Sequence, residues 1–342
     1  MIGGEFDFSI EKDIPKKDFF CLDGFFYSSG RAALYHCIKH AISKNNYKQI
    51  MLPDYLCESI LDIVYLFDLP ILYYSLNEDL SVNLNQLEDS YKKRSLVLFI
   101  NYFGILDNSH YYQVLKQIDS EVCIIEDNVQ SFYKMYESRS ADYSFSSFRK
   151  TFPVPDGGWV KSKYSDLEQV IGQNHFAQYK IAASTLKSLR EDLPEVEDKF
   201  YMSLFDQGEK LINADINAEI SSTTSGKIQI IDFKSVKNKR KRNADFVVKE
   251  LAKLEIFPIV PYLNEIPLFI PIRLRNRDKI RKMMFSKGIF CPVHWPVRKK
   301  EFSCLKRGEE LSKNELSLII DQRYNVEQLA SIIHIIKDNI NA

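Results

Sequence analysis

The sequence predicts an α/β fold with a mostly parallel central sheet flanked by helices, followed by a smaller α+β domain. Residues 31–126 alternate between short apolar runs and amphipathic segments. The apolar runs are continuous, which is typical of parallel strands buried on both faces. After Gly158 the pattern becomes mainly helical. A chain of 342 residues is long enough for two domains. We therefore expect a large domain over residues 1–225 and a small C-terminal domain over 226–342.

The first half supplies the predicted sheet. Leu34, Cys37, Ile38 and Ala41 share one face of a predicted helix over 31–45. The elements expected after it are a strand at 49–53, a helix at 55–67, a strand at 70–74, a helix at 83–92, a strand at 95–101, a helix at 109–118 and a strand at 122–126. Ligands of such sheets bind beyond the carboxyl ends of the strands, where Asp127 and the turn 101–104 are expected.

The second half predicts mostly helices. Ser165 and Glu168 form a capping-box pattern that predicts a helix start. A helix is expected over 195–212, and the serine- and threonine-rich run 221–226 is typical of a linker. The small domain is expected to contain a helix at 235–254, a strand at 267–273, a helix at 276–286 and a last helix capped by Asn325 with Gln328, which buries Leu329, Ile332, Ile333 and Ile336.

Composition and charge exclude several classes of protein. The chain has 46 basic and 46 acidic residues, so it lacks the basic field that would attract nucleic acids or anionic membranes. It has no signal-peptide pattern at its start and no apolar run of about 18 residues. Its six cysteines (21, 37, 57, 123, 291 and 304) are scattered, which favours free thiols in a reducing compartment. We expect a cytoplasmic protein without nucleic-acid or membrane partners.

Two residues predict a specific chemistry. Lys150 follows a segment rich in serine and phenylalanine, and Asp127 ends an apolar strand upstream. Pyridoxal 5'-phosphate (PLP) chemistry requires an amine that forms a Schiff base and a carboxylate that keeps the ring nitrogen protonated. The sequence therefore predicts a PLP site with Lys150 and Asp127 as catalytic residues. The neighbours Phe145, Phe148 and Phe152 predict a desolvated Lys150 with a lowered pKa.

Each of these residues could also have a simpler, non-catalytic role. A lone lysine is usually a solvated surface charge, and an aspartate after a strand is often a cap or turn residue. Glu126 precedes Asp127 and should point to the other face of the strand. The segment Ser29-Gly30-Arg31 opens the first helix, whose free backbone N–H groups can bind phosphate, the alternative being an ordinary capped helix.

Other candidate sites are weaker. His36 and His40 have the i,i+4 spacing of some metal ligands, but the expected glutamate is missing and Cys37 faces the core, which favours a hydrogen-bonded pair. The basic run 237–242 could be a nucleic-acid patch, but the neutral charge of the chain favours a solvated helix face. Glycine is only 12 of 342 residues, and no glycine-rich nucleotide loop is present.

Together these residues resemble the DegT/DnrJ/EryC1/StrS family of PLP-dependent aminotransferases, which act mostly on nucleotide-linked keto sugars. The resemblance covers nearly the whole chain, and its motifs keep the family's order. They are Ile2-Gly3-Gly4-Glu5-Phe6, Ser29-Gly30-Arg31-Ala32-Ala33-Leu34, Tyr102-Phe103-Gly104, Glu126-Asp127-Asn128-Val129-Gln130-Ser131, Phe148-Arg149-Lys150 with Asp156-Gly157-Gly158, and Gly288-Ile289 with Pro292-Val293-His294-Trp295-Pro296.

The resemblance implies fold type I and a role for each matching position. Lys150 would carry PLP covalently, Asp127 would pair with the ring nitrogen, and Gln130 would lie near the phenolic oxygen. Phe145 occupies the family's usual serine position, so one of three nearby serines must contact the phosphate instead. The implied cofactor-binding residues are Ser29, Gly30, Arg31, Tyr55, Cys57, Asp127, Gln130, Ser144, Ser146, Ser147 and Lys150, with no metal ligand.

The implied function is an aminotransferase that moves an amino group from glutamate to a keto group of a nucleotide-linked sugar, for a glycan or a secondary metabolite. Family members share active sites between two subunits, which implies a homodimer. One alternative is another PLP reaction, a dehydratase or lyase; the family's dehydratases have histidine in place of the lysine, so Lys150 counts against it. The other is a non-catalytic, ligand-binding relative, which the intact Asp127 and Lys150 pair disfavours.

Overall fold

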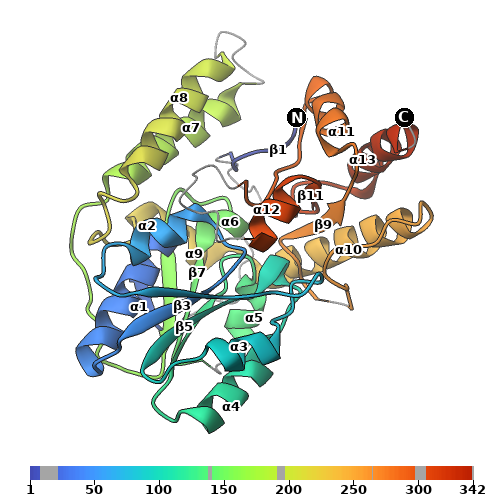
Figure 1. Cartoon of the computed structure of the whole chain (residues 1–342). Coiled ribbons are helices and arrows are strands. Elements are labelled where there is room, and N and C mark those ends of the chain that lie inside the picture. Colours follow the sequence, from blue (N-terminus) through green and yellow to red (C-terminus); the bar gives the residue numbers. More distant parts are fainter. Residues whose placement is uncertain (8–21, 138–140, 191–196, 264, 297–305, 341–342) are drawn as a thin grey trace. The chain divides into compact units, whose positions relative to one another are not determined.

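The computed structural model describes residues 1–7, 22–137, 141–190, 197–263, 265–296 and 306–340 (Figure 1). The chain divides into two compact units, which we call the first and the second unit. The first unit comprises residues 1–4, 46–141 and 234–342. The second comprises residues 5–45 and 142–233. In the part of the chain that is described, no helix has the length and apolar character needed to cross a membrane.

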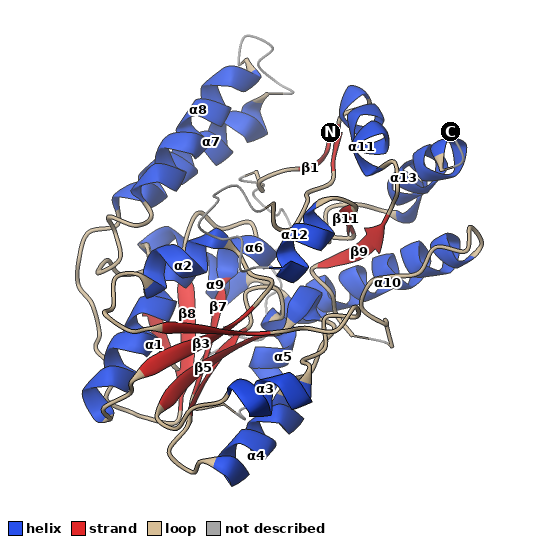
Figure 2. Ribbon diagram, in the orientation of Figure 1, coloured by secondary structure: helices blue, strands red, loops and turns tan. Residues whose placement is uncertain are grey.

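The first unit contains four parallel strands in the order β6-β5-β3-β4. They are β3 (Gln49–Pro53), β4 (Ile71–Tyr74), β5 (Ser95–Ile100) and β6 (Cys123–Asp127). Every residue of β3, β5 and β6 is buried, as continuous apolar strands of a parallel sheet require. Strands β3 and β5 run side by side in Figure 2. Ile100 of β5 is in register with Asp127 of β6, so their carboxyl ends meet at one edge.

Short helices connect these strands because each parallel crossover must return the chain to the same edge. The connecting segments are α2 (Glu58–Val64), α3 (Leu84–Ser90), the 3-10 turn η1 (Tyr102–Gly104) and α4 (Ser109–Ile118), and α5 (Phe132–Glu137) follows β6. From residue 49 to residue 127 the order of helices and strands follows the prediction, whereas α5 was not predicted. Helix α2 is shorter than the predicted 55–67, since it begins after Cys57 and is followed by turns.

The C-terminal part of the first unit has an apolar core of its own, drawn from residues 244–336. Strands β9 (Phe269–Arg273) and β11 (Glu315–Ile319) pair antiparallel, and β1 (Ile2–Gly3) pairs parallel with β10 (Ile289–Phe290). The helices are α10 (Phe233–Ala252), α11 (Arg277–Ser286), α12 (Lys306–Ser312) and α13 (Val326–Asn339). A separate core is what the predicted small domain requires, while its boundary at residue 226 stays a prediction.

The second unit contains three antiparallel strands, with β8 (Gly158–Ser162) between β2 (Phe25–Tyr27) and β7 (Tyr143–Ser147). Its helices are α1 (Gly30–Lys44), α6 (Phe148–Thr151), α7 (His175–Leu189), α8 (Asp198–Leu211) and α9 (Ser222–Ile230). Helices α7 and α8 lie side by side in both ribbon views (Figures 1 and 2). Across the chain the strand order is β2-β8-β7-β6-β5-β3-β4, a seven-stranded sheet. The predicted α/β class with a mostly parallel central sheet is confirmed.

Two predicted features of the second unit are wrong. No helix begins at Ser165, because the acidic side chains of that segment bind α1 instead: Glu168 accepts from Lys39 at 2.5 Å, and Asp166 lies 3.2 Å from His40. The run 221–226 is not a linker. Ser221 caps α9 by accepting a hydrogen bond from the backbone N–H of Thr224, so the polar run starts a helix.

The predicted solvated face over 237–242 is right except at Arg240. This side chain is 1% exposed, and its guanidinium lies 3.4 Å from the carbonyl oxygen of Leu268. The period of α10 places Arg240 on the same buried face as Val236 and Ala244, whereas Lys241 pairs with Asp245 at the surface. Hydrophobic periodicity could not reveal a buried arginine inside a basic run.

Candidate active site

Asp127 is a buried acid at the carboxyl end of β6. Its side chain is 6% exposed, and its Oδ1 accepts a hydrogen bond of 2.8 Å from the backbone N–H of Val129. Burial raises the pKa of Asp127 to about 7, with the Val129 hydrogen bond opposing and the charge of Glu126 adding to the rise. A cation placed against this carboxyl would offset the desolvation and favour the charged form.

The neighbouring Glu126 has a structural role. Its Oε1 accepts hydrogen bonds from Asn101 at 3.0 Å and from the Tyr112 hydroxyl at 2.8 Å, and its Oε2 accepts from Asn128 at 2.7 Å. Successive side chains of a strand point to opposite faces, which separates Glu126 from Asp127 as predicted. Because its donors come from within the first unit, Glu126 anchors the loops after β5 and β6.

Gln130 joins two of the predicted motifs. Its Oε1 accepts a hydrogen bond of 2.8 Å from the backbone N–H of Phe103, in the turn that follows β5. Phe103 has φ 58° and Gly104 has φ 78°, and a Cβ on Gly104 would lie 2.6 Å from the backbone oxygen of Gln130. Only glycine allows this close approach without strain, which explains the residue at this position.

Tyr55 belongs to an aromatic cluster with Tyr102 and Trp295. Its ring centroid lies 5.4 Å from that of Tyr102 and 5.0 Å from that of Trp295. The Tyr55 hydroxyl donates to the carbonyl oxygen of His294, and the Tyr102 hydroxyl donates to the carbonyl oxygen of Tyr55. Burial raises the pKa of both tyrosines well above the usual value, so both stay protonated donors. Cys57 is half-buried at the start of α2, where its Sγ accepts from Ser59.

The cluster includes residues to which sequence reasoning gave no role. Trp295 and Tyr102 stood in motifs that carried the family resemblance, but nothing in the sequence showed that they would meet Tyr55. The three side chains come from segments far apart in the chain, so only the fold brings them together. They form a buried aromatic cluster within the first unit, in which Tyr55 is 0% and Tyr102 is 2% exposed.

In the second unit, the predicted phosphate segment forms the N-terminus of α1. Ser29 is the N-cap, and its Oγ accepts from the backbone N–H of Ala32 at 3.1 Å. Gly30 is the first helical residue. A Cβ on Gly158 would lie 2.0 Å from the carbonyl oxygen of Ser29, so strand β8 passes directly against this helix start. The free N–H groups of such a terminus suit a phosphate.

The three candidate serines lie on β7, and all are buried. Alternation along the strand places Ser144 and Ser146 on one face and Ser147 on the other, together with Phe145. Ser147 pairs in register with Gly158, and its Oγ lies 3.5 Å from the carbonyl oxygen of Gly157. Each face of β7 therefore carries a candidate serine, and the choice of the serine that would contact the phosphate stays open.

Lys150 differs from the prediction of a desolvated amine, because its side chain is exposed. It lies in α6, a single helical turn in which Phe148 and Thr151 are buried. The helical period turns Lys150 away from the buried face that its aromatic neighbours occupy. Arg31 is also engaged: its guanidinium donates to Glu209 Oε1 at 2.8 Å and to Asn213 Oδ1 at 3.0 Å.

The predicted site residues are divided between the two units. Asp127, Gln130, Tyr55 and Cys57 belong to the first unit. The remaining candidates, Ser29, Gly30, Arg31, Ser144, Ser146, Ser147 and Lys150, belong to the second. The convergence of Asp127 and Lys150 on one ring therefore stays a prediction.

The two histidines are hydrogen-bonded, as the sequence predicts. His36 Nε2 lies 3.2 Å from the carbonyl oxygen of Ile216 and its ring stacks on Tyr27, while His40 Nδ1 lies 2.7 Å from the Tyr143 hydroxyl. Among the described residues, no group of three histidine, cysteine or acidic side chains is placed to hold a metal ion. The described cysteines 37, 57, 123 and 291 are free thiols.

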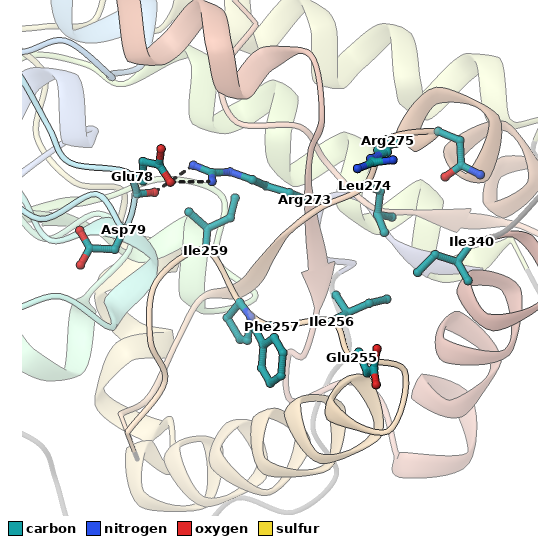
Figure 3. A pocket seen from close by; sticks show the side chains of 12 residues that line it. Glu78, Asp79, Glu255, Ile256, Phe257, Ile259, Arg273, Leu274, Arg275 and Ile340 are labelled. Carbon is teal, nitrogen blue, oxygen red and sulfur yellow. Dashed lines mark hydrogen bonds and ion pairs between the residues drawn. The ribbon is translucent and has the colours of Figure 1, made fainter.

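The first unit also has a pocket of about 600 Å³ beside β9, lined by none of the predicted site residues. Figure 3 shows Arg273 reaching toward Glu78, whose carbonyl oxygen lies 3.0 Å from the guanidinium. Acidic and basic side chains both line the pocket, among them Glu255 and Arg275, together with the exposed ring of Phe257. Because the lining carries both acidic and basic side chains, it favours neither anionic nor cationic ligands.

No family model matches the sequence, and no curated protein matches it. Solved structures do match. DesV from S. venezuelae, in complex with a ketimine intermediate, is 17% identical, with 93% of this chain and 85% of that chain covered and a TM-score of 0.68. Spr1654 from Streptococcus pneumoniae, named a sugar aminotransferase and solved in its PLP form, is 16% identical, with 92% and 86% covered and a TM-score of 0.66.

A DegT DnrJ EryC1 StrS aminotransferase from Brucella abortus is 14% identical, with 93% of this chain and 86% of that chain covered and a TM-score of 0.65. At these identities the likeness shows the fold. The fold is that of the fold type I PLP-dependent transferases, which confirms the predicted fold class. The motifs resemble those of the DegT/DnrJ/EryC1/StrS family, and the fold is the one that this resemblance implies.

Proposed function

We propose that this chain is a PLP-dependent aminotransferase. The observation that carries the proposal is Asp127: a buried carboxyl with a raised pKa, at the carboxyl end of a parallel strand, in a fold used by PLP-dependent enzymes. Burying an acid in this way is unfavourable unless a cationic partner compensates for it. A protonated ring nitrogen is such a partner, and its pairing with Asp127 would make the ring an electron sink when PLP is bound.

The other residues fit the remaining parts of the cofactor. Gln130 uses its Oε1 to accept from Phe103, which leaves its amide nitrogen to donate to the phenolic oxygen. The N-terminus of α1 at Ser29 and Gly30 would bind the phosphate through backbone N–H groups, assisted by a serine of β7. By the family resemblance, Cys57, with Tyr55 nearby, would lie against one face of the ring.

Lys150 would hold the cofactor covalently and act as the proton carrier. Once released, its Nζ would move a proton between the α-carbon of the amino donor and the C4' carbon of the cofactor. The side chain of Lys150 is exposed on the short helix α6, so its amine is accessible to small molecules. Two half-reactions on one site predict ping-pong kinetics.

The finer parts of the proposal rest on the family resemblance of the motifs. The amino donor would be glutamate, and the acceptor a keto group of a nucleotide-linked sugar used for a glycan or a secondary metabolite. The fold shared with Spr1654, a protein named as a sugar aminotransferase, supports a sugar as acceptor. We further propose a homodimer, and a cytoplasmic location that is supported by the free thiols of the described cysteines.

A spectral titration tests this function. The purified chain is incubated with PLP, and its absorbance is followed while glutamate is added. We expect the absorbance of bound PLP to be replaced by that of the amine form, and a later keto-sugar nucleotide to reverse the change. A chain that binds PLP but shows no change with any amino acid would contradict an aminotransferase and favour a lyase, a dehydratase or a non-catalytic binder.

A further inference from the structure

The first unit contains a buried glutamate that the proposed mechanism does not use. Glu315 is the first residue of β11 and is 0% exposed. Its Oε1 accepts a hydrogen bond of 2.5 Å from the Ser317 hydroxyl, and its Oε2 accepts one of 2.7 Å from the backbone N–H of His294. Residues two apart on a strand share a face, which explains why Glu315 and Ser317 meet. Both carboxyl oxygens are therefore bound by neutral donors, in a place where burial opposes the charged form.

Ser317 connects this acid to the imidazole of His294. Its Oγ lies 2.8 Å from His294 Nδ1, and the serine is 0% exposed. The histidine is half-buried, and its ring centroid lies 5.6 Å from that of Phe103 and 5.0 Å from that of Phe269. Glutamate, serine and histidine thus form one hydrogen-bonded chain, which we call the Glu315 relay and which consists of Glu315, Ser317 and His294.

The single hydrogen of the Ser317 hydroxyl makes the two ends of the relay depend on each other, because it can be donated to only one neighbour at a time. An ionised Glu315 can only accept, so Ser317 donates to it and accepts from His294, whose proton is then on Nδ1. A protonated Glu315 carries its proton on Oε1, because Oε2 faces the backbone N–H. It then donates to Ser317, Ser317 donates to Nδ1, and the histidine proton is on Nε2. The protonation state of Glu315 therefore fixes the tautomer of a neutral His294.

We propose that the Glu315 relay makes His294 Nε2 an acid–base group that releases or takes up a proton while its imidazole stays uncharged. When Nε2 releases its proton, the Glu315 proton moves to Ser317 and the Ser317 proton moves to Nδ1. One proton leaves the relay, and the negative charge remains on Glu315. The backbone oxygen of His294 accepts from the Tyr55 hydroxyl, so this group lies in a segment that contacts a candidate cofactor-binding residue. The relay needs no cofactor, so it goes beyond the proposed function and is independent of it.

The surroundings of Glu315 allow it to change its protonation state in a moderate pH range. Burial raises the pKa of Glu315 from the ordinary 4.5 to about 8. The hydrogen bonds from Ser317 and His294 oppose this rise, and so do the positive charges of Arg277 and Arg281 on α11. Arg277 also donates at 2.7 Å to the backbone oxygen of Glu315. The acid end of the relay is therefore protonated below about pH 8 and charged above it.

Three further groups near the relay keep one state in this range. Burial raises the pKa of Tyr55 well above its usual value and that of Cys291 to about 12, so both stay protonated around pH 8. Arg273 of β9 is in register with Glu315, and its guanidinium, which stays charged, donates to the backbone oxygen of Glu78. A change of pH around 8 thus acts on Glu315 and, through Ser317, on the histidine.

Nitrogen NMR of the histidine rings tests the relay in the full-length chain without added PLP. In 15N-labelled histidine the protonated and unprotonated nitrogens of a neutral ring have well separated shifts, whereas the two nitrogens of an imidazolium have similar ones. The chain has six histidines, and the signals that disappear in His294→Gln identify His294. We expect its proton to be mainly on Nε2 at about pH 7 and on Nδ1 at about pH 10, with a midpoint near pH 8 and no imidazolium in between.

Two variants break the relay in different ways. Glu315→Gln should hold the Nε2–H tautomer over the whole series, because its amide oxygen would accept from the backbone N–H of His294 and its NH2 group would donate to Ser317. Ser317→Ala removes the connecting hydroxyl and should abolish the change of tautomer. Glu309→Gln, the same substitution at a residue of α12 that pairs with Lys313 at the surface, is the matched control and should keep the wild-type change.

A tautomer that stays constant across the wild-type series overturns the relay, and so does an imidazolium on the acid side of the midpoint at pH 7. A wild-type change of tautomer in Glu315→Gln overturns it as well. If circular dichroism shows that Glu315→Gln does not fold, Ser317→Ala decides: a change of tautomer retained there means that no proton passes through the serine. Since these spectra need neither PLP nor turnover, a failure to transaminate would contradict the proposed function without affecting this result.

Discussion

The side-chain oxygen of Gln130 accepts a hydrogen bond of 2.8 Å from the backbone N–H of Phe103. This contact connects the loop after β6 with the turn after β5, two neighbouring parallel strands. Both loops carry motifs of the candidate site, so the hydrogen bond ties the predicted aspartate segment to the aromatic residues around Tyr102. The hydrogen bond therefore holds the two loops together at the edge where the carboxyl ends of β5 and β6 meet.

We expect Gly104 to be essential for the close approach of these two loops. A Cβ at this residue would lie 2.6 Å from the backbone oxygen of Gln130 and 2.9 Å from that of Ile266, and φ is 78°. We expect Gly104→Ala to lower the free energy of unfolding by about 1–3 kcal/mol, measured by urea denaturation. Gly226→Ala is the control: it lies in α9 with open space around it and should stabilise by about 0.5–1 kcal/mol. Equal stability of Gly104→Ala and wild type would refute the close approach.

Lys150→Ala should abolish the absorbance of covalently bound PLP and reduce turnover to background, because no other group of the site would carry the cofactor. The fold should be unaffected, since Lys150 is exposed and surface substitutions usually change stability by less than about 0.5 kcal/mol. Absorbance, turnover and the melting temperature check the three points. The control is Lys39→Ala, another exposed lysine of the second unit. Wild-type turnover in Lys150→Ala would show that the assignment is wrong.

Asp127→Asn should reduce turnover by roughly a hundredfold or more while PLP still binds to Lys150. The amide cannot hold the ring nitrogen in its protonated form, so the ring would lose its strength as an electron sink. Steady-state rates and the spectrum of bound PLP give the measurement. An unchanged catalytic rate would show that Asp127 does not act on the ring nitrogen.

The pKa of Asp127 makes a separate prediction about stability. The folded-state value of about 7 lies above the ordinary 3.8, so between about pH 4 and pH 7 the folded chain binds more protons than the unfolded chain. Asp127 therefore makes the chain without cofactor less stable as the pH rises through this window. Asp127→Asn removes the effect, and its stability relative to wild type should increase by about 1–4 kcal/mol from pH 4 to pH 8.

Urea denaturation at a series of pH values measures this difference. Asp206→Asn, at an exposed position on α8, serves as the control and should show a constant difference from wild type. If Asp127→Asn also differs from wild type by a constant amount, Asp127 is charged throughout the range and its burial has little effect. A gain in stability accompanied by a loss of turnover would be typical of a residue kept for function.

Much of the fold could be predicted because its signals are local. The continuous apolar runs at β3, β5 and β6 and the capping box of Asn325 with Gln328 appear in the structure where they were expected. The errors arose where distant partners decided the outcome. Ser165 does not start a helix because the acids that follow it bind α1, and Ser221 caps a helix whose polar composition suggested a linker.

The candidate site shows the same division. Asp127 could be identified from its place at the end of an apolar strand, and its burial follows from that strand's place inside the sheet. The exposure of Lys150 could not be inferred from its aromatic neighbours, because the direction of a side chain in a single helical turn depends on how that turn packs. The contact of Ser317 with His294 gave no signal at all, since the spacing of two residues in a sequence does not show their distance in space.

The sequence by itself determined the α/β class, the order of the strands along the chain and the residue types able to bind PLP, because periodicity and residue chemistry act over short distances. The tertiary structure alone decided that Gln130 binds Phe103, that Tyr55 meets Trp295 and that Ser317 joins Glu315 to His294. These contacts join segments far apart in the chain, and their energies depend on burial and on charge separation, which exist only once the chain has folded.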